Sequence, residues 1–154
     1  NPGAKDPYDF TLRKVSDGSA VRFADAKGKI AGLNFWATWC GPCRALEPLL
    51  DRVAARYIGK GDVIFYALNC DDDESLVQPY LTEEKFKTPA LFADGLDRAF
   101  RIENFPTTVV LDKTGKIAFR ADGFDPDSFE KSLTEVIDRL EQEHPAAPPT
   151  AAAK

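Results

Sequence analysis

Two cysteines separated by two residues are the part of the sequence best suited to chemistry. Cys40 and Cys43 enclose Gly41-Pro42 and follow an apolar stretch, residues 30–37, that predicts a strand. A helical pattern runs from about residue 42 to 57, so Cys40 lies where a strand passes into a helix. The free N–H groups and the positive end of a helix dipole stabilise a thiolate there and lower the pKa of the thiol. The pattern predicts thiol–disulfide exchange, with Cys40 as nucleophile and Cys43 as resolving thiol.

A zinc site or a purely structural pair is the alternative interpretation of these cysteines. Structural zinc sites usually take four Cys or His ligands. The chain has three cysteines and one histidine, His144, which falls near the C-terminal end. No second Cys-x-x-Cys is present, and a Cys-x-x-Cys after a strand is itself typical of redox proteins. We therefore expect no metal site and no organic cofactor.

The residues around the two cysteines match a known active-site pattern. The run from Trp39 to Cys43, preceded by Phe35-Trp36-Ala37, resembles the active site of the thioredoxin superfamily. Pro48 resembles the proline that kinks the active-site helix of that family, and Phe105-Pro106-Thr107-Thr108 resembles its cis-proline loop. The resemblance implies that the Phe105–Pro106 bond is cis and lies against the cysteine pair.

The same resemblance implies roles for the residues near the cysteines. The catalytic residues are Cys40 and Cys43. The residues that support the active site are Trp39, Gly41, Pro42, Asn34 and Pro106. The residues that bind substrate are Trp39, Phe105, Pro106, Gly123 and Phe124. Trp36, in contrast, is expected in the core.

Two features favour one branch of the superfamily. Residues 10–15 and 20–23 alternate around Asp17-Gly18, which predicts a β-hairpin, whereas plain thioredoxins open with a helix. The separation between Cys40 and Pro106 leaves room for an inserted strand and helix. Both features resemble the TlpA/ResA-like extracytoplasmic thiol–disulfide oxidoreductases of bacteria. That resemblance implies an α/β thioredoxin-like sandwich: a central mixed sheet with helices on both faces, an N-terminal hairpin and the inserted strand–helix.

The resemblance also implies a direction and a setting for the reaction. Gly-Pro between the cysteines resembles the reducing members, which implies a reductase of protein disulfides in cytochrome c maturation or envelope redox homeostasis. The implied partners are disulfide-containing or dithiol protein substrates and an upstream dithiol donor. A thiol peroxidase would need a proline and threonine pattern before Cys40 that is missing. A copper chaperone of related fold would need a Cys-x-x-x-Cys and a nearby ligand histidine.

Length and charge bound the organisation of the chain. Its 154 residues predict one domain at 10–143, between a flexible leader at 1–9 and a disordered Pro/Ala-rich tail at 144–154. The net charge of −5 argues against nucleic-acid binding, and no apolar run is long enough to span a membrane. Because the chain begins at Asn1 and has no Met, we expect either a processed form or an otherwise shortened one, and removal of an N-terminal signal or anchor is one of the two alternatives. We expect a monomer, periplasmic or membrane-anchored in its full-length form, and a cytoplasmic location stays open.

Along the chain, alternating or apolar runs predict strands and period-3.6 patterns predict helices. The expected strands after the hairpin are 30–37, 62–69, 88–93, 107–112 and 116–121, and the expected helices are 42–57, 74–86, 96–102 and 125–143.

Four positions need separate interpretation. Thioredoxins carry a buried Asp and a partner Lys where this chain has Asn34 and Ala67, so both halves of a charge pair are absent together. The TlpA/ResA-like branch often has a Glu at the position of Leu46. Glu47 comes one residue later and should point elsewhere on the helix, so it is expected to be a surface carboxylate, with a proton shuttle as the alternative. Cys70 is expected to be a small buried hydrophobe at a strand end. The acidic run 71–74 is expected to begin a helix.

Overall fold

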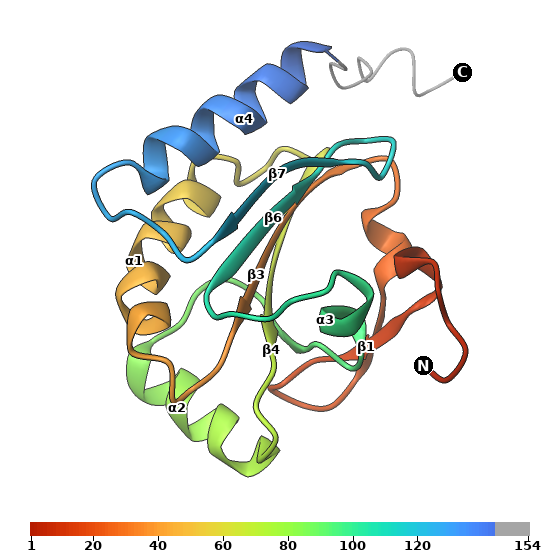
Figure 1. Ribbon diagram of the computed structural model, residues 1–154, viewed down its shortest axis with the longest axis vertical. Coiled ribbons are helices and arrows are strands. Elements are labelled where there is room, and N and C mark those ends of the chain that lie inside the picture. Colours follow the sequence, from red (N-terminus) through yellow and green to blue (C-terminus); the bar gives the residue numbers. More distant parts are fainter. Residues whose placement is uncertain (144–154) are drawn as a thin grey trace.

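The computed structural model describes residues 1–143, which fold around a five-stranded mixed sheet (Figure 1). The strands are β3 (Ile30–Trp36), β4 (Val63–Asn69), β5 (Ala90–Phe92), β6 (Thr107–Leu111) and β7 (Ile117–Asp122), in the order β5-β4-β3-β6-β7. β3, β4 and β5 run parallel, and β6 runs antiparallel to both β3 and β7. The predicted mixed sheet is therefore confirmed. The tail expected at 144–154 lies outside the described residues.

Helices cover both faces of the sheet, as predicted. α1 (Gly41–Ala55), α2 (Val77–Glu84) and α4 (Phe129–Glu143) lie on one face, and the short α3 (Leu96–Ala99) lies on the other with the N-terminal hairpin (Figure 1). None of the helices within residues 1–143 is both long and apolar enough to cross a membrane.

β3 is the central strand of the sheet, and every one of its residues is buried. Strands that are covered on both faces read as apolar runs, as residues 30–37 do. Leu33 and Phe35 pack into the cluster under the hairpin and α3, whereas Ile30 packs under α1 and α4. Gly32 faces the ring of Phe65 on the neighbouring strand, and a Cβ atom at this position would lie only 2.6 Å from that ring.

The hairpin is also present, as β1 (Thr11–Arg13) and β2 (Ala20–Arg22). It forms a separate two-stranded sheet that meets the edge of the main sheet, where the backbone N–H of Val15 donates to the carbonyl of Ala90 at 3.1 Å. A 3₁₀ helix, η2 (Phe23–Ala26), then leads towards β3.

The segment expected to be a loose leader makes contacts with the domain. It contains a 3₁₀ helix, η1 (Pro7–Asp9), and the ring of Tyr8 stacks on Phe23 with 5.6 Å between centroids. The Asn1 side chain donates to the carbonyls of Thr11 and Asp94 at 2.9 and 2.8 Å. The division of the chain at residue 10 stays a prediction.

Several helix boundaries differ from the sequence expectation. The helix expected from residue 74 begins as a 3₁₀ turn, η3 (Glu74–Leu76), and Leu76 in this turn is 51% exposed. The inserted helix stops at Ala99, because the chain turns at Arg101 with φ of 53°. The last helix begins at Phe129 and not at residue 125, since Asp125 accepts turn hydrogen bonds from the N–H groups of residues 128 and 129.

Candidate active site

Cys40 is the N-cap of α1, the position that the sequence predicts for it. The turn from Ala37 delivers it there, with the Cys40 N–H donating to the Ala37 carbonyl at 3.2 Å. The backbone N–H of Cys43 donates to the Cys40 sulfur at 3.2 Å, so one of the free N–H groups of the first helical turn points at this sulfur. Such donors, with the helix dipole, stabilise a thiolate.

The two cysteines form a disulfide, with 5.3 Å between their Cα atoms. Cys40 is 5% exposed and Cys43 only 1%. Cys40, at the helix start, is therefore the more exposed residue of the two, and Cys43 lies deeper. This difference agrees with an attacking role for Cys40 and a resolving role for Cys43.

The loop before β6 lies at the same end of the sheet as the cysteines. The Phe105–Pro106 bond is cis, as predicted. Because β6 is antiparallel to β3, its first residue, Thr107, pairs with Phe35 near the end of β3. The topology thus brings the proline loop to the turn that carries Cys40.

Two aromatic side chains form a rim beside the cysteines. Trp39 is 70% exposed, and its ring meets that of Phe105 edge to face, with 5.6 Å between centroids. Phe105 packs against the hydrophobic cluster that contains both cysteines. An exposed tryptophan next to a reactive sulfur is suited to contact with a partner.

The second loop expected to bind substrate is only partly joined to this rim. The N–H of Gly123 donates to the carbonyl of Pro106 at 2.7 Å, which places Gly123 beside the proline. Phe124 turns the other way, and its ring packs edge to face on Phe129 of α4. The structure therefore brings Gly123, but not the ring of Phe124, to the Trp39–Phe105 rim.

Asn34 is buried behind the cysteines. Its side-chain amide donates to the hydroxyl of Thr108 at 3.4 Å, and in the sheet it is aligned with Ala67 on β4. At the two positions where thioredoxins carry a charge pair, this chain thus has two uncharged side chains that are aligned in the sheet. A neutral hydrogen-bonded amide avoids the penalty of an unpaired buried charge.

The expectation that Glu47 is a surface carboxylate is wrong. Glu47 is 6% exposed, and it accepts a hydrogen bond from the hydroxyl of Tyr80 on α2 at 2.8 Å. Burial raises the pKa of Glu47 to about 7, helped by the carboxylates of Glu84 and Asp51 and opposed by the Tyr80 hydrogen bond. Glu47 points to a different side of α1 from Leu46, but α2 covers that side of the helix as well. An inward-facing Tyr80 in the helix after β4 was the available signal.

Sequence reasoning also missed the role of Asp71. Of the acidic run 71–74, Asp73 does begin a helix, since its carboxylate accepts from the N–H of Ser75 at 3.1 Å. Asp71 is instead buried and accepts from the backbone N–H and the hydroxyl of Thr38, both at 2.9 Å. An Asp two residues after the strand that neighbours the cysteine-bearing strand was the only signal.

Cys70 is the third cysteine, and it is half-buried and unpaired. Its thiol lies 3.6 Å from the carbonyl of Leu68, and burial raises its pKa above the ordinary range of a thiol. A neutral thiol is a poor nucleophile. This environment is consistent with a packing role.

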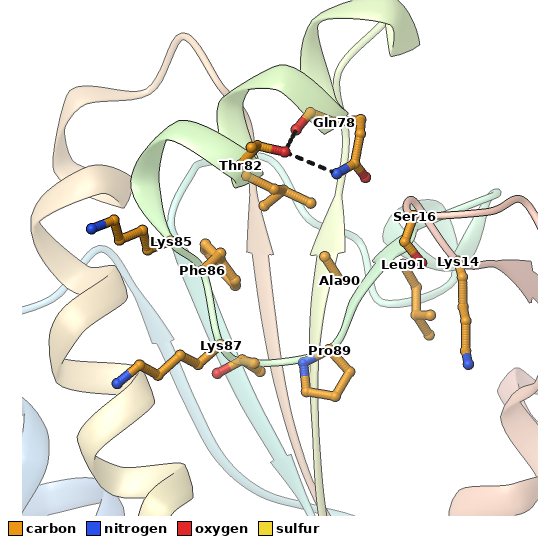
Figure 2. A pocket seen from close by; sticks show the side chains of 12 residues that line it. Lys14, Ser16, Gln78, Thr82, Lys85, Phe86, Lys87, Pro89, Ala90 and Leu91 are labelled. Carbon is orange, nitrogen blue, oxygen red and sulfur yellow. Dashed lines mark hydrogen bonds between the residues drawn. The ribbon is translucent and has the colours of Figure 1, made fainter.

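A pocket of about 480 Å³ lies beside β5, away from the cysteines. It is lined by α2, the loop before β5 and the hairpin, with Phe86 and Pro89 among its walls (Figure 2). Figure 2 shows that Lys85 and Lys87 extend to the side opposite Lys14, so these ammonium groups do not converge on one point. Within residues 1–143, no group of three or more His, Cys, Asp or Glu side chains is arranged to hold a metal ion.

The sequence is similar to those of known thiol–disulfide oxidoreductases and thioredoxin-like proteins. The chain is 34% identical over 113 residues to the thioredoxin-like protein YneN of Bacillus subtilis, covering 71% of this chain and 65% of YneN. It is 35% identical over 114 residues to the thiol-disulfide oxidoreductase ResA of Oceanobacillus iheyensis, covering 71% of this chain and 59% of ResA. The chain thus spans less than two thirds of the length of these curated relatives.

A solved structure gives the same result for the fold. It is that of a Chlorobium tepidum protein provisionally named thiol:disulfide interchange protein DsbE, with a TM-score of 0.77 and 28% identity, covering 91% of this chain and 97% of the other. Together these similarities confirm the resemblance to the TlpA/ResA-like branch of the thioredoxin superfamily. The model of the Redoxin family matches residues 2–137, and the chain therefore belongs to the Redoxin family.

Proposed function

We propose that this chain is a thiol–disulfide oxidoreductase that reduces disulfides in other proteins. The observation that carries the proposal is the Cys40–Cys43 pair at the start of α1, beneath an exposed aromatic rim and beside a cis proline. The names of the curated relatives support it, since ResA is called a thiol-disulfide oxidoreductase.

The reaction needs two exchange steps. The Cys40 thiolate attacks one sulfur of a substrate disulfide, which forms a mixed disulfide and releases the other substrate sulfur as a thiolate. Cys43 loses its proton and attacks the Cys40 sulfur, which forms the Cys40–Cys43 disulfide and releases the second substrate thiolate. Two electrons have then passed from the protein to the substrate, and an upstream dithiol donor must return them.

The substrate-binding surface is the rim around Cys40. Trp39 and Phe105 offer aromatic contact area, and the backbone before Pro106 is suited to pairing with an extended substrate segment. Gly123 supports this loop through its hydrogen bond to Pro106. Contact between Phe124 and a substrate stays a prediction. Gly41, Pro42 and Asn34 support the active site around the cysteines.

Glu47 is our candidate for the group that takes the proton of Cys43. It lies four residues after Cys43, and residues four apart are neighbours on a helix surface. A buried carboxyl with a pKa of about 7 exchanges protons readily near neutral pH. Asn34 cannot do this, because its amide does not titrate.

The setting of the reaction is a further part of the proposal. We infer an extracytoplasmic protein, periplasmic or membrane-anchored in its full-length form, that acts as a monomer in cytochrome c maturation or envelope redox homeostasis. Similarity to ResA and to a protein provisionally named DsbE supports this setting. The proposed division of the chain is a domain at 10–143 with a leader at 1–9 and a tail at 144–154.

Trapping of mixed disulfides tests the proposed function. The reduced protein is mixed with insulin as a model disulfide substrate, and adducts are read on non-reducing gels and by mass spectrometry. We expect Cys43→Ser to accumulate a mixed disulfide through Cys40, and Cys40→Ser to form none. All variants carry Cys70→Ala, so that no other thiol contributes, and the Cys70→Ala parent should reduce insulin at the wild-type rate. Equal trapping by the two variants would reject the assigned roles.

A further inference from the structure

We propose that Asp71 is a positioning residue of the exchange site, whose buried carboxylate fixes the turn that carries Trp39 and Cys40. The inference rests on the proposed function, because it concerns how Cys40 is presented to a substrate. The side-chain hydrogen bonds of Asp71 run to Thr38 and Asn69, so Asp71 acts on Cys40 through Thr38.

The carboxylate joins two segments that are far apart in the sequence. One oxygen accepts from the Thr38 hydroxyl at 2.9 Å, and the other accepts from the Thr38 backbone N–H at 2.9 Å. Both polar hydrogens of Thr38 are therefore held by one side chain. Since Thr38 follows directly after Ala37 in the turn to Cys40, this bond fixes the middle of that turn.

Asp71 is held in turn by Asn69, the last residue of β4. The amide of Asn69 donates to the carboxylate at 2.7 Å, and its carbonyl oxygen accepts from the backbone N–H of Asp71 at 3.0 Å. This reciprocal pair leaves the carboxylate little freedom to rotate. It also supplies a third donor to a buried acidic group, which would otherwise be costly to desolvate.

The position of this contact explains its use. β3 and β4 are paired up to Trp36 and Asn69, and the backbone N–H of Cys70 still donates to the carbonyl of Trp36 at 2.9 Å. Beyond that point the two chains diverge, one into the active-site turn and the other towards η3. The Asp71–Thr38 contact holds the two segments together beyond the last residue pair of β3 and β4, where the backbone hydrogen bonds between the two strands have ended.

Two other interpretations of Asp71 fit the structure less well. A helix-capping role belongs to Asp73, whose carboxylate is bonded to Ser75. A cation site would need further ligands, and no such group is found among residues 1–143. What remains is a buried side chain whose hydrogen bonds run to the turn before Cys40.

Loss of the contact should change how Cys40 sits on the helix N-terminus. Asp71→Ala removes both acceptor oxygens, so the bonds to Thr38 and to Asn69 are lost together. Thr38→Val removes only the hydroxyl, and Thr38→Ser keeps both donors. Asp73→Ala is the matched control, because Asp73 accepts from an N–H and a hydroxyl in the same way but outside the turn.

The experiment measures two properties of each variant. In a Cys43→Ser, Cys70→Ala background, the rate of Cys40 alkylation by iodoacetamide is followed against pH. With both active-site cysteines present, kcat/KM for insulin reduction is measured. We expect Asp71→Ala to move the alkylation midpoint up by about half a pH unit and to lower kcat/KM about tenfold. Loss of the Asp71 charge alone would move the midpoint down, so an upward shift reports the looser turn. Thr38→Val should change both in the same direction by less, whereas Thr38→Ser and Asp73→Ala should match the parent.

A structural role alone would give a different result. If Asp71→Ala and Thr38→Val lower only the melting temperature, with unchanged midpoint and kcat/KM, the positioning role is rejected. Should Asp71→Ala fail to fold, Thr38→Val decides, because it keeps the side-chain shape. Failure of the proposed function is separate: it would appear as an inactive parent that traps no mixed disulfide, while the alkylation midpoint still reports on the contact.

Discussion

Trp36 and Trp39 are three residues apart and lie in opposite environments. Trp36 is fully buried and stacks on Phe86, with 5.4 Å between ring centroids, whereas Trp39 is largely in solvent. The difference arises because β3 ends at Trp36 and the chain then turns outward to reach the start of α1. One tryptophan therefore supports the site from below, and the other is free to contact a partner.

Glu47 gives a prediction for the pH dependence of stability. Its pKa is raised by burial from 4.5 to about 7 in the folded protein. A raised carboxyl pKa means that the folded state binds the proton more tightly than the unfolded state. The folded protein should therefore lose stability as the pH rises from about 4.5 to about 7, by at most about 3 kcal/mol from this group.

Substitution of the carboxyl isolates that contribution. Glu47→Gln keeps an acceptor for the Tyr80 hydroxyl and removes the titration, so its urea stability should change less between pH 5 and pH 8 than that of the wild type. Glu83→Gln, on an exposed part of α2, is the matched control and should keep the wild-type profile. Identical profiles for Glu47→Gln and the wild type would mean that Glu47 ionises as it does in the unfolded chain.

At the scale of elements, the strands and helices around the cysteines were predictable and two contacts within the site were not. β3 and α1 lie within two residues of their expected bounds, because a buried strand and an amphipathic helix each leave a local pattern. The contacts of Glu47 and Asp71 leave no such periodic pattern, only the weaker signals described above. The burial of Glu47 depends on where α2 packs, and the partner of Asp71 lies 33 residues earlier in the chain, so both follow from tertiary structure only.

The packing of β3 against β4 gives a prediction for one glycine. A methyl group at Gly32 would lie 2.6 Å from the ring of Phe65, closer than van der Waals contact allows. Gly32→Ala should therefore destabilise the protein by about 1–3 kcal/mol, measured by urea unfolding. Gly61→Ala, where nothing lies within 4 Å of the new methyl group, should stay within about 0.5 kcal/mol of the wild type.

A second substitution tests the cause of that loss. Phe65→Leu removes the ring atoms that the new methyl group would meet, so Gly32→Ala should be less harmful in the Phe65→Leu background than in the wild type. If the losses of unfolding free energy from the two substitutions simply add, Gly32→Ala acts through the strand backbone and not through contact with the ring.

At the scale of the whole molecule, the antiparallel direction of β6 next to β3 brings the loops of the site together. The cysteine turn leaves the carboxyl end of β3, which is central in the sheet. β4 runs parallel to β3 and brings Asp71 to that end, whereas β6 runs antiparallel and brings the Phe105–Pro106 loop there with its first residue. Ligand sites of α/β sheets commonly lie at such carboxyl ends. The topology thus gathers three loops around the sulfurs.

The redox state of the pair should be linked to the stability of the whole domain. Folding and disulfide formation form a thermodynamic cycle, so a couple that is more reducing when folded than when unfolded makes the oxidised form the more stable one. Each 30 mV of that difference corresponds to about 1.4 kcal/mol. The N-cap position of Cys40 favours a thiolate and hence the reduced form, but Cys43 is almost fully buried, which disfavours a second charge.

We expect burial to outweigh the helix terminus, as the proposed reductase function requires, so that the oxidised protein melts at the higher temperature. For a chain of this size, about 1 kcal/mol corresponds to about 2–4 °C. The measurement compares thermal unfolding of the oxidised and the reduced protein in the Cys70→Ala background, with the potential of the couple determined against glutathione. Values near −270 mV are typical of thioredoxin and values near −120 mV of the oxidant DsbA. A reduced form that melts higher, with a potential on the oxidising side, would reverse the direction proposed for the reaction and leave the roles of Cys40 and Cys43 intact.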